Sequence, residues 1–342
     1  MARRRRPAPQ PRDPRRYLLA VLAVLVAYGW NWLQQQQGTQ RGTQQRPSTT
    51  QREGGGSGAV PGGPAPGRPA ERPGVAAIGT FNIEWFGSGG THEPRTDSDM
   101  RAIAGVIKDT GAPLLGLQEI GDEATMDRLL RFLPGYEYVL GTSGRGQRCG
   151  MLWDTTRASV GRPREWPDIN DELERSEGTL RAPLIAQARV GDFDFLFVVV
   201  HLKAMFDDKA IRTRRTQTRR MRARLDEWVA ENPDKDVIVV GDFNDMEDSP
   251  AMAEITGKRG GGGAGFVNTG ARLPEKVGTY LGRSGRIDHI LVSSPYVSQE
   301  EWTGEVFVYP KPRGDERKAY EAGVSDHLPS WATFRADRDN DP

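Results

Sequence analysis

Acidic, amide and imidazole side chains stand at or just beyond the ends of several short apolar runs in the chain. These residues are Asn82, Glu119, His201, Asp242, Asn244, Asp326 and His327. Taken singly, each has an ordinary explanation, because Asp and Asn are common turn residues. The combination is more informative. Three of the four histidines, His201, His289 and His327, lie in or just after apolar segments, and two of them directly follow an aspartate. Since the ends of a rigid scaffold are where functional side chains gather, these positions predict one shared site.

Three of these side chains are carboxylates that would repel one another if they met. Two carboxylates about 4 Å apart repel by about 4 kcal/mol at an effective dielectric constant of about 20. A divalent cation removes this repulsion, and a ligand set of Glu119, Asp242 and Asp326 with amide oxygens suits Mg²⁺, Mn²⁺ or Ca²⁺. The sequence has no Cys/His cluster of the kind that holds structural zinc. A hard cation beside imidazoles suits phosphate, because the cation neutralises phosphate oxygens while imidazole handles protons.

The elements that must position these residues can be predicted from apolar periodicity. Strands are expected at Ala76–Ile83, Leu114–Gln118, Gly150–Trp153, Phe193–His201, Val237–Val240, Ile287–Val292 and Ser330–Phe334. Amphipathic helices are expected at Ser98–Asp109, at Glu123–Phe132 and from about Asp208 to Ala230. Strands outnumber helices, which predicts a fold of mixed α and β elements with a large sheet content.

Six motifs in order along residues 75–334 resemble the endonuclease/exonuclease/phosphatase family. They are Phe81-Asn82-Ile83-Glu84-Trp85, Leu117-Gln118-Glu119, His201-Leu202-Lys203, Gly241-Asp242-Phe243-Asn244, Arg286-Ile287-Asp288-His289-Ile290 and Ser325-Asp326-His327-Leu328-Pro329. The resemblance implies a four-layered α/β/β/α sandwich, in which two packed mixed sheets are flanked by helices and the site lies at one edge.

The same resemblance implies roles for individual residues. Glu119 would be the principal ligand of Mg²⁺ or Mn²⁺, with Asn82 and Asp326 assisting and Ca²⁺ as a candidate second ion. Asp242 would position or deprotonate the attacking water, and Asn244 would orient it. His201 and His327 would stabilise the transition state, and Asp288 would orient His327. Whether histidine or aspartate is the general base stays open at this point.

The chain also departs from the deoxyribonuclease branch of that family. Arg181-Ala182-Pro183 resembles a motif whose arginine reaches a phosphate, although a solvated arginine at a strand edge is the alternative. Where that branch carries a tyrosine and a glutamate to support the first histidine, this chain has Arg145-Gly146-Gln147-Arg148. Gln147 could donate a hydrogen bond to His201 but supplies no charge.

The N-terminal 74 residues differ in composition from the rest. Seven arginines within residues 1–16 precede an apolar segment at 17–33, which predicts a membrane-spanning signal anchor with the catalytic domain outside the cytoplasm. A cleaved signal peptide, which would yield a secreted protein, is the alternative. Residues 34–74 are rich in Gln, Gly and Pro and predict a disordered linker, which leaves 75–337 as the catalytic domain.

Charge and composition limit the possible classes of substrate only in part. Residues 1–74 hold 12 basic and 3 acidic residues, so the formal net charge of +1 for the whole chain leaves a balance of −8 on residues 75–342. The net negative charge of residues 75–342 argues against electrostatic binding of nucleic acid over a large surface. The segment Lys209 to Arg224 nevertheless holds eight basic residues and no acid, and either tracks a phosphate backbone or forms a solvated helix face.

Three functions remain open. The expected function is a monomeric nuclease that cuts DNA, or else RNA, by attack of an activated water on a phosphodiester. The alternative within the same chemistry is a phosphatase or a phospholipid or sphingolipid phosphodiesterase. A binding module without catalysis is disfavoured by the intact set of polar residues.

Overall fold

The computed structural model describes residues 72–87, 94–257, 265–282 and 285–339, all of which belong to one compact unit. The predicted signal anchor at 17–33 and nearly all of the predicted linker lie outside the described residues. Among the helices that the structure does describe, none combines the length and apolar composition needed to span a membrane.

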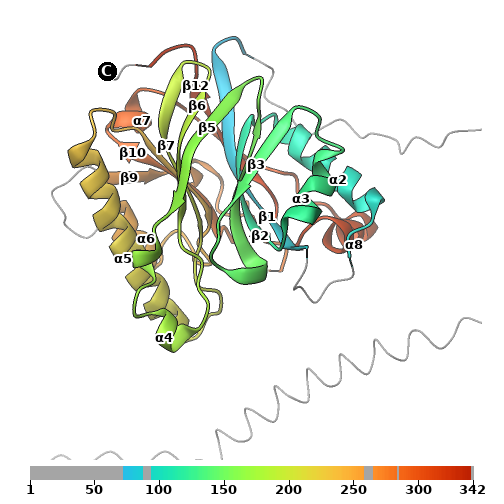
Figure 1. Ribbon diagram of the computed structural model, residues 1–342, viewed down its shortest axis with the longest axis horizontal. Helices are drawn as coiled ribbons and strands as arrows, with labels where there is room; N and C mark the ends of the chain where they lie inside the picture. The colour runs from blue at the N-terminus through green and yellow to red at the C-terminus, as the bar shows by residue number, and fades with distance from the viewer. Residues whose placement is uncertain (1–71, 88–93, 258–264, 283–284, 340–342) are drawn as a thin grey trace, which may run out of the picture. The chain divides into compact units, whose positions relative to one another are not determined.

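Two six-stranded mixed sheets form the centre of the fold (Figure 1). The first has the order β11-β12-β1-β2-β4-β3. Its strands are β1 (Val75–Phe86), β2 (Leu114–Ile120), β3 (Tyr136–Leu140), β4 (Arg148–Asp154), β11 (Trp302–Val308) and β12 (Ser330–Arg335). The second has the order β5-β6-β7-β8-β10-β9. Its strands are β5 (Ala158–Glu165), β6 (Leu184–Val190), β7 (Phe193–His201), β8 (Val237–Asp242), β9 (Gly265–Asn268) and β10 (Asp288–Ser294).

Each sheet contains one parallel pair at its centre, and these pairs decide where the site lies. β1 runs parallel to β2 in the first sheet, and β7 runs parallel to β8 in the second. Because the carboxyl ends of parallel strands meet at one edge, residues that follow neighbouring parallel strands are brought together. All other strand pairs among the described residues are antiparallel.

The two sheets pack face to face because their central strands are apolar on both sides. In β7, Phe195, Phe197 and Val199 point into the core between the sheets, while Leu196 and Val198 point to the opposite face. This alternation is the period of two that a strand imposes. The sheets approach each other closely at Gly116 of β2, where an added Cβ would lie 2.5 Å from Val240 Cγ2.

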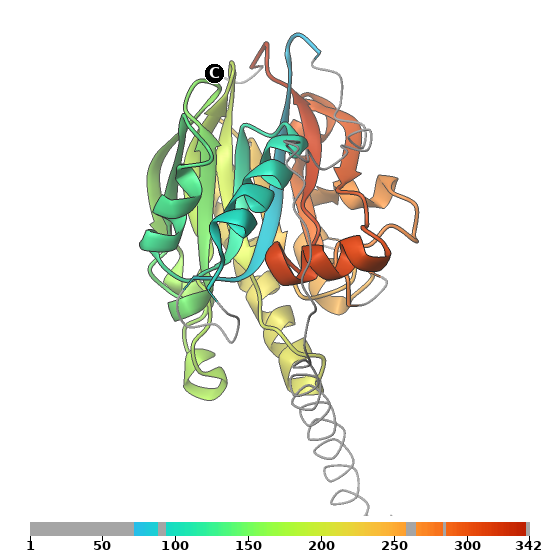
Figure 2. The same cartoon turned by 90° about the vertical axis from the view of Figure 1, so that its right-hand side faces the viewer.

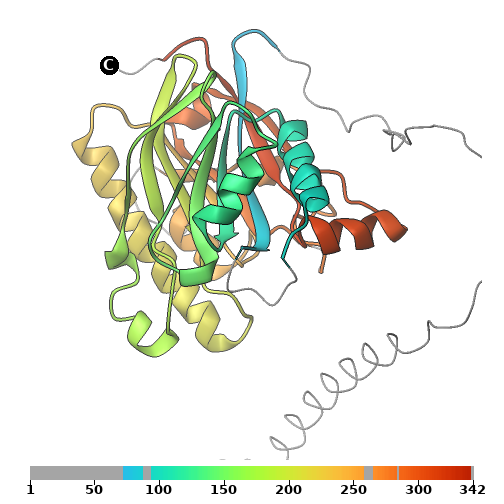
Figure 3. The same cartoon turned by 45° about the vertical axis from the view of Figure 1, so that its right-hand side comes forward.

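Helices cover the outer face of each sheet, as Figures 2 and 3 show from the side. Helices α2 (Asp97–Thr110), α3 (Glu123–Leu130) and α8 (Gly314–Gly323) contribute buried residues to the core on the first sheet. Helices α5 (Asp208–Glu231) and α6 (Pro250–Thr256) do the same on the second. The short helices α4 (Glu174–Glu177) and α7 (Tyr296–Gln299) lie in connections. The predicted four-layered sandwich is therefore confirmed.

The central strands were predicted within a few residues, whereas the edge strands were not. The exposed edge strand β5 has an almost fully polar outer segment, Gly161–Glu165, so it carries no apolar alternation to detect. The strands β3, β6, β9 and β11, which are short or lie at or next to a sheet edge, were not predicted either.

Candidate active site

The ends of the two parallel strand pairs meet across the gap between the sheets. Asn82 near the end of β1 donates from Nδ2 to Glu119 Oε1 on β2 at 3.2 Å. The same nitrogen donates to Asp242 Oδ2 at the end of β8 in the other sheet, at 3.1 Å. Asn82 is fully buried, so these hydrogen bonds fix its amide between two carboxylates. The amide nitrogen therefore faces the carboxylates, while the oxygen accepts from Glu84 N at 3.0 Å.

The backbone around Glu119 is shaped by left-handed conformations. Glu119 has φ of 63°, and Glu84 and Trp85 have φ of 45° and 46°. The register between β1 and β2 also shifts in this region, as at a β-bulge. Trp85 N donates to Glu119 Oε2 at 3.0 Å and so holds the carboxylate in place. Such non-glycine conformations cost of order 1 kcal/mol each and cluster at functional sites.

The end of β8 depends on a glycine. Gly241 has φ of 146°, and a Cβ there would lie 2.0 Å from Val200 O. Glycine thus lets β8 approach β7 closely and brings Asp242 level with His201, its register partner. Beyond the strand, Asn244 donates from its backbone N to Asp242 Oδ1 at 2.7 Å and from Nδ2 to Leu202 O at 3.3 Å.

His201 lies in this arrangement as a neutral imidazole. Its Nε2 is 3.6 Å from Asp242 Oδ2, 3.8 Å from Glu119 Oε1 and 2.5 Å from Arg181 Nη2. Burial, followed by the positive charges of Arg181 and His327, lowers its pKa well below the usual 6.5. Nε2 accepts from the guanidinium, so Nδ1 carries the proton, and Nδ1 has no partner within the described part of the chain.

His327 forms a second, charged pair with Asp288. Its Nδ1 is 2.8 Å from Asp288 Oδ2, and both side chains are buried. Burial opposes the imidazolium, but the charge and hydrogen bond of Asp288, helped by Asp242 and Asp326, raise the pKa of His327 to about 10. The other nitrogen, Nε2, is 3.9 Å from Asp242 Oδ2 and 3.8 Å from Asp326 Oδ1. His327 is therefore a cation at neutral pH that faces the carboxylates.

Two backbone supports place this pair. Asp288 opens β10 opposite Asp242 of β8, and its backbone N donates to Thr279 Oγ1. Ser325 Oγ donates to Asn82 O at 2.7 Å and accepts from His327 N at 2.9 Å. The loop that carries His327 is thereby tied to β1.

Two carboxyl groups of the site have raised pKa values, in part because several negative charges lie close together. Burial raises the pKa of Asp242 to about 7, and the charges of Asp288 and Glu119 add to this while His327 opposes it. Burial likewise raises the pKa of Asp326 to about 7, with contributions from Glu84, Glu119 and Asp288. Acids held this unfavourably without a cation suit a bound divalent metal.

The donor set also fits a hard cation. Donor atoms of Glu119, His201 and Asp242 lie within 4.8 Å of one another. Two of these three residues offer carboxylate oxygens, which favours Mg²⁺ or Mn²⁺ over zinc.

The family profile described as Endonuclease/Exonuclease/phosphatase family matches residues 79–327, which include every residue of the site. The chain belongs to this family. Among curated proteins, none matches it by sequence.

Solved structures agree on the fold at low sequence identity. TDP2 of D. rerio in complex with a single-strand DNA product is 18% identical, covers 76% of this chain and 98% of its own, and has a TM-score of 0.57. Truncated TDP2 of Caenorhabditis elegans is 17% identical, with 77% and 98% covered and a TM-score of 0.55. A mannosyl-6-phosphatase of Bacteroides thetaiotaomicron is also 17% identical, with 76% and 99% covered and a TM-score of 0.54.

All nine site residues expected from the sequence of this family member lie at the same rim. Arg181 is buried against His201 rather than solvated at a strand edge. Gln147 has no hydrogen bond to His201 among the described residues; its backbone N bonds Gly144 O instead.

Glu84, for which the sequence predicted no role, accepts a hydrogen bond at Oε2 from Asp326 N at 3.1 Å. Its position two residues after Asn82, within the same motif, was the feature of the sequence that could have indicated a role. Thr279 and Ser325 were missed because hydroxyl groups in loops carry no pattern.

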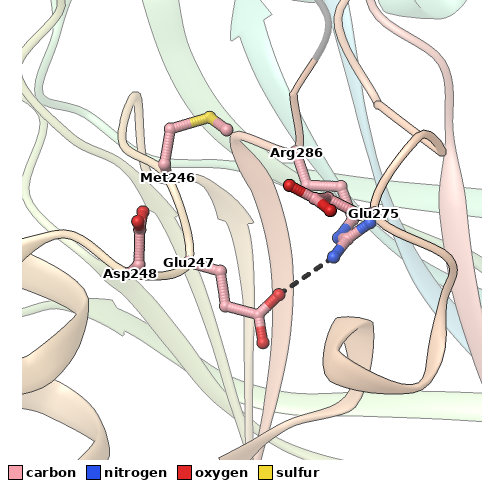
Figure 4. A pocket seen from close by; sticks show the side chains of 5 residues that line it. All are labelled: Met246, Glu247, Asp248, Glu275 and Arg286. Atoms are coloured by element: carbon pink, nitrogen blue, oxygen red, sulfur yellow. Dashed lines mark hydrogen bonds and ion pairs between the residues drawn. The ribbon is translucent and has the colours of Figure 1, made fainter.

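An acidic cavity of about 340 Å³ has some of its lining on the segments that carry the site, because Met246–Asp248 follow Asn244 and Arg286 precedes Asp288. Figure 4 shows Met246, Glu247, Asp248, Glu275 and Arg286 around it. Among the described lining residues the one cation is Arg286, which is paired with Glu247 at 3.0 Å.

The basic residues of α5 are mostly engaged by the protein itself. Arg215 pairs with Glu254, Arg220 donates to Asp171 O, and Arg224 pairs with Asp168 and Glu227. These contacts favour the solvated helix face over a surface that tracks nucleic acid.

Proposed function

We propose that this family member is a divalent-metal-dependent phosphodiester hydrolase that acts on DNA, or else RNA, as a monomer. The observation that carries the proposal is the position of Asp242, which lies between neutral His201 and charged His327 and has a pKa of about 7. A carboxylate whose pKa is near neutral pH can accept a proton, and a neighbouring imidazolium can donate one. Attack of water on a phosphate requires such a pair of groups.

Each side chain then has a distinct role. Asp242 accepts the proton of the attacking water, and Asn244, hydrogen-bonded to Asp242, orients that water. His327 has a pKa of about 10 and so cannot accept a proton at neutral pH; it donates to a phosphate oxygen and stabilises the added charge. Arg181 and His201 meet the phosphate from the other side.

Glu119 and Asp326 would hold Mg²⁺ or Mn²⁺, with Ca²⁺ as a candidate second ion, and the cation would neutralise phosphate oxygens. Asn82 as the structure places it offers its amide N–H groups to Glu119 and Asp242. We therefore propose that Asn82 holds these two carboxylates in place. If the amide were rotated by about 180°, as a flipped amide is, its oxygen would face the cation and Asn82 would itself be a ligand.

A nucleic acid substrate is supported by the fold, since the TDP2 structure of the same fold holds a single-strand DNA product. The second candidate is a small phosphate ester, which includes phospholipid and sphingolipid headgroups. The internally paired arginines of α5 and the acidic lining at Glu247 and Asp248, which follow Asn244 in the chain, favour this candidate, because an extended polyanion needs free cations along its path.

We further propose that the apolar segment at 17–33 anchors the catalytic domain on the outer side of a bacterial-type cytoplasmic membrane. The arginine-rich segment before it and the polar linker after it support this orientation. Cleavage of the segment would instead release a secreted enzyme. Membrane fractionation followed by N-terminal sequencing of the mature protein decides between the two.

Digestion of supercoiled plasmid tests the substrate. The catalytic domain with Mg²⁺ should convert supercoiled to nicked DNA, and a chelator should stop it. Turnover of p-nitrophenyl phosphate or of sphingomyelin without any nicking would transfer the assignment to the second candidate.

A further inference from the structure

Arg214 on α5 is among the largest fully buried side chains of the molecule, and no sequence motif singles it out. Its guanidinium donates in two directions. Nη1 donates to Lys203 O at 2.8 Å and to Met205 O at 2.6 Å, and Nε donates to Asp245 Oδ2 at 3.0 Å. The side chain thus joins two backbone segments that are far apart in the sequence.

Both segments continue directly from the strands of the candidate site. Lys203–Met205 follows β7, which ends at His201, and Asp245 follows Asn244 beyond β8. Met205 has φ of 85°, an unfavourable conformation for a residue with a side chain, and it turns its carbonyl to Arg214.

Other buried groups hold the same two segments. Gln217, one turn later on α5, accepts from Lys203 N at 3.1 Å and donates to Asn170 Oδ1. From the opposite side, His289 lies 2.9 Å from Asp245 O through Nε2, while its Nδ1 faces Asn268 Nδ2. Arg214 is the one among these groups that contacts both segments.

We propose that Arg214 is a positioning residue that fixes the separation of the His201 segment from the Asp242–Asn244 segment. A planar guanidinium presents donors at fixed angles, so it can hold both segments only at one spacing. Its burial makes the link obligatory, because a buried arginine without partners is strongly unfavourable. The proposal rests on the proposed function in that it takes His201 and Asp242 as reacting groups.

The experiment compares Arg214 with Arg222, a buried arginine two turns later on the same helix. Arg222 donates to Ile255 O and pairs with Asp226, and so it stabilises α6 rather than the site. The variants are Arg214→Lys, Arg214→Met, Arg222→Lys and Arg222→Met, each made in the full-length chain. Hydrolysis of bis(p-nitrophenyl) phosphate with Mn²⁺ gives kcat and KM for each.

The expected result is a loss in kcat with little change in KM. A displacement of about 1 Å costs about 100-fold in rate, so Arg214→Met should lower kcat by about 100-fold and Arg214→Lys by about 10-fold. KM should stay within about threefold, and both Arg222 variants should keep kcat within about threefold at a comparable loss of stability. Equal kcat losses at both positions would overturn the proposal.

Amide hydrogen exchange gives a second readout that does not depend on activity. Leu202 N donates to Asp242 O at 2.9 Å, so this amide reports on the spacing of the two segments. Exchange at Leu202 should be at least about tenfold faster in the Arg214 variants than in the wild type, and unchanged in the Arg222 variants. Unchanged exchange at Leu202 in the Arg214 variants would refute the positioning role. If the wild type hydrolyses no phosphodiester, the proposed function fails while the exchange data still decide the role of Arg214. If Arg214→Met does not fold, Arg214→Lys supports both readouts.

Discussion

Replacing Asp288 with asparagine removes the charge that keeps His327 protonated while preserving the size of the side chain. In the wild type the pKa of His327 is about 10, with Asp288 as the strongest contribution against burial. Without that charge, the pKa should return to about 6.5 or below. At pH 7.5 a histidine of pKa about 6.5 is about one-tenth protonated, so at least about tenfold of the rate is lost through charge alone.

The sign of the pH dependence follows from the same shift. His327 acts as a cation, so its contribution to the rate is present below its pKa and is lost above it. The wild type should therefore keep this contribution up to about pH 10. Asp288→Asn should instead lose activity progressively above about pH 6.5.

Two measurements test this reasoning. Rates for bis(p-nitrophenyl) phosphate from about pH 5.5, one unit below the pKa expected in Asp288→Asn, to about pH 9.5, just below the pKa of wild-type His327, give the profile. Nuclear magnetic resonance of ¹³C-labelled histidine in chelator gives the titration directly, which is tractable with four histidines. Asp236→Asn is the matched control, since Asp236 is a buried aspartate before the opposite end of β8. A wild-type His327 that titrates near pH 6.5, or an unaltered alkaline limb in Asp288→Asn, would refute the proposed charge.

The geometry leads to three further predictions. Glu119→Gln should lower activity by at least about 100-fold and weaken Mn²⁺ binding in calorimetry with the fold unchanged; wild-type Mn²⁺ affinity in this variant would exclude Glu119 as a ligand. Burial raises the pKa of the Cys149 thiol to about 12, so the native protein should not react with Ellman's reagent at pH 8 and should react fully in denaturant; rapid native labelling would contradict that burial. Gly241→Ala places a Cβ against Val200 O and should destabilise the protein by about 2 kcal/mol or more in urea unfolding, whereas a change below about 0.5 kcal/mol would show that β8 can move away.

The stability of the His327–Asp288 pair has its own pH dependence. Because the pKa of His327 is higher in the folded than in the unfolded chain, the pair stabilises the fold fully below about pH 6.5. That contribution declines as the pH rises toward about 10. The difference in unfolding free energy between wild type and Asp288→Asn should therefore be larger at pH 6 than at pH 9.5, as measured by urea titration.

Apolar periodicity and local motifs determined much of this protein by themselves. The run from Phe193 to His201 can only be a strand buried on both faces, and the structure has a strand with those bounds. The polar residues that end such strands have no role in the core, so they mark the site wherever the strands lead. For that reason Glu119, His201 and Asp242 were identifiable without coordinates.

Tertiary structure alone decided the electrostatics of the site and its support. Which histidine is charged depends on whether a carboxylate or a guanidinium lies beside it: Arg181 lies beside His201, and Asp288 lies beside His327. The local sequence around each histidine does not specify that partner, because Arg181 comes from the segment before the neighbouring strand β6 and Asp288 lies in the other sheet from the strand that follows His327. Arg214 is the clearest case: its sequence neighbourhood is that of a solvated basic helix, and only the packing of α5 against two strand ends buries it between them.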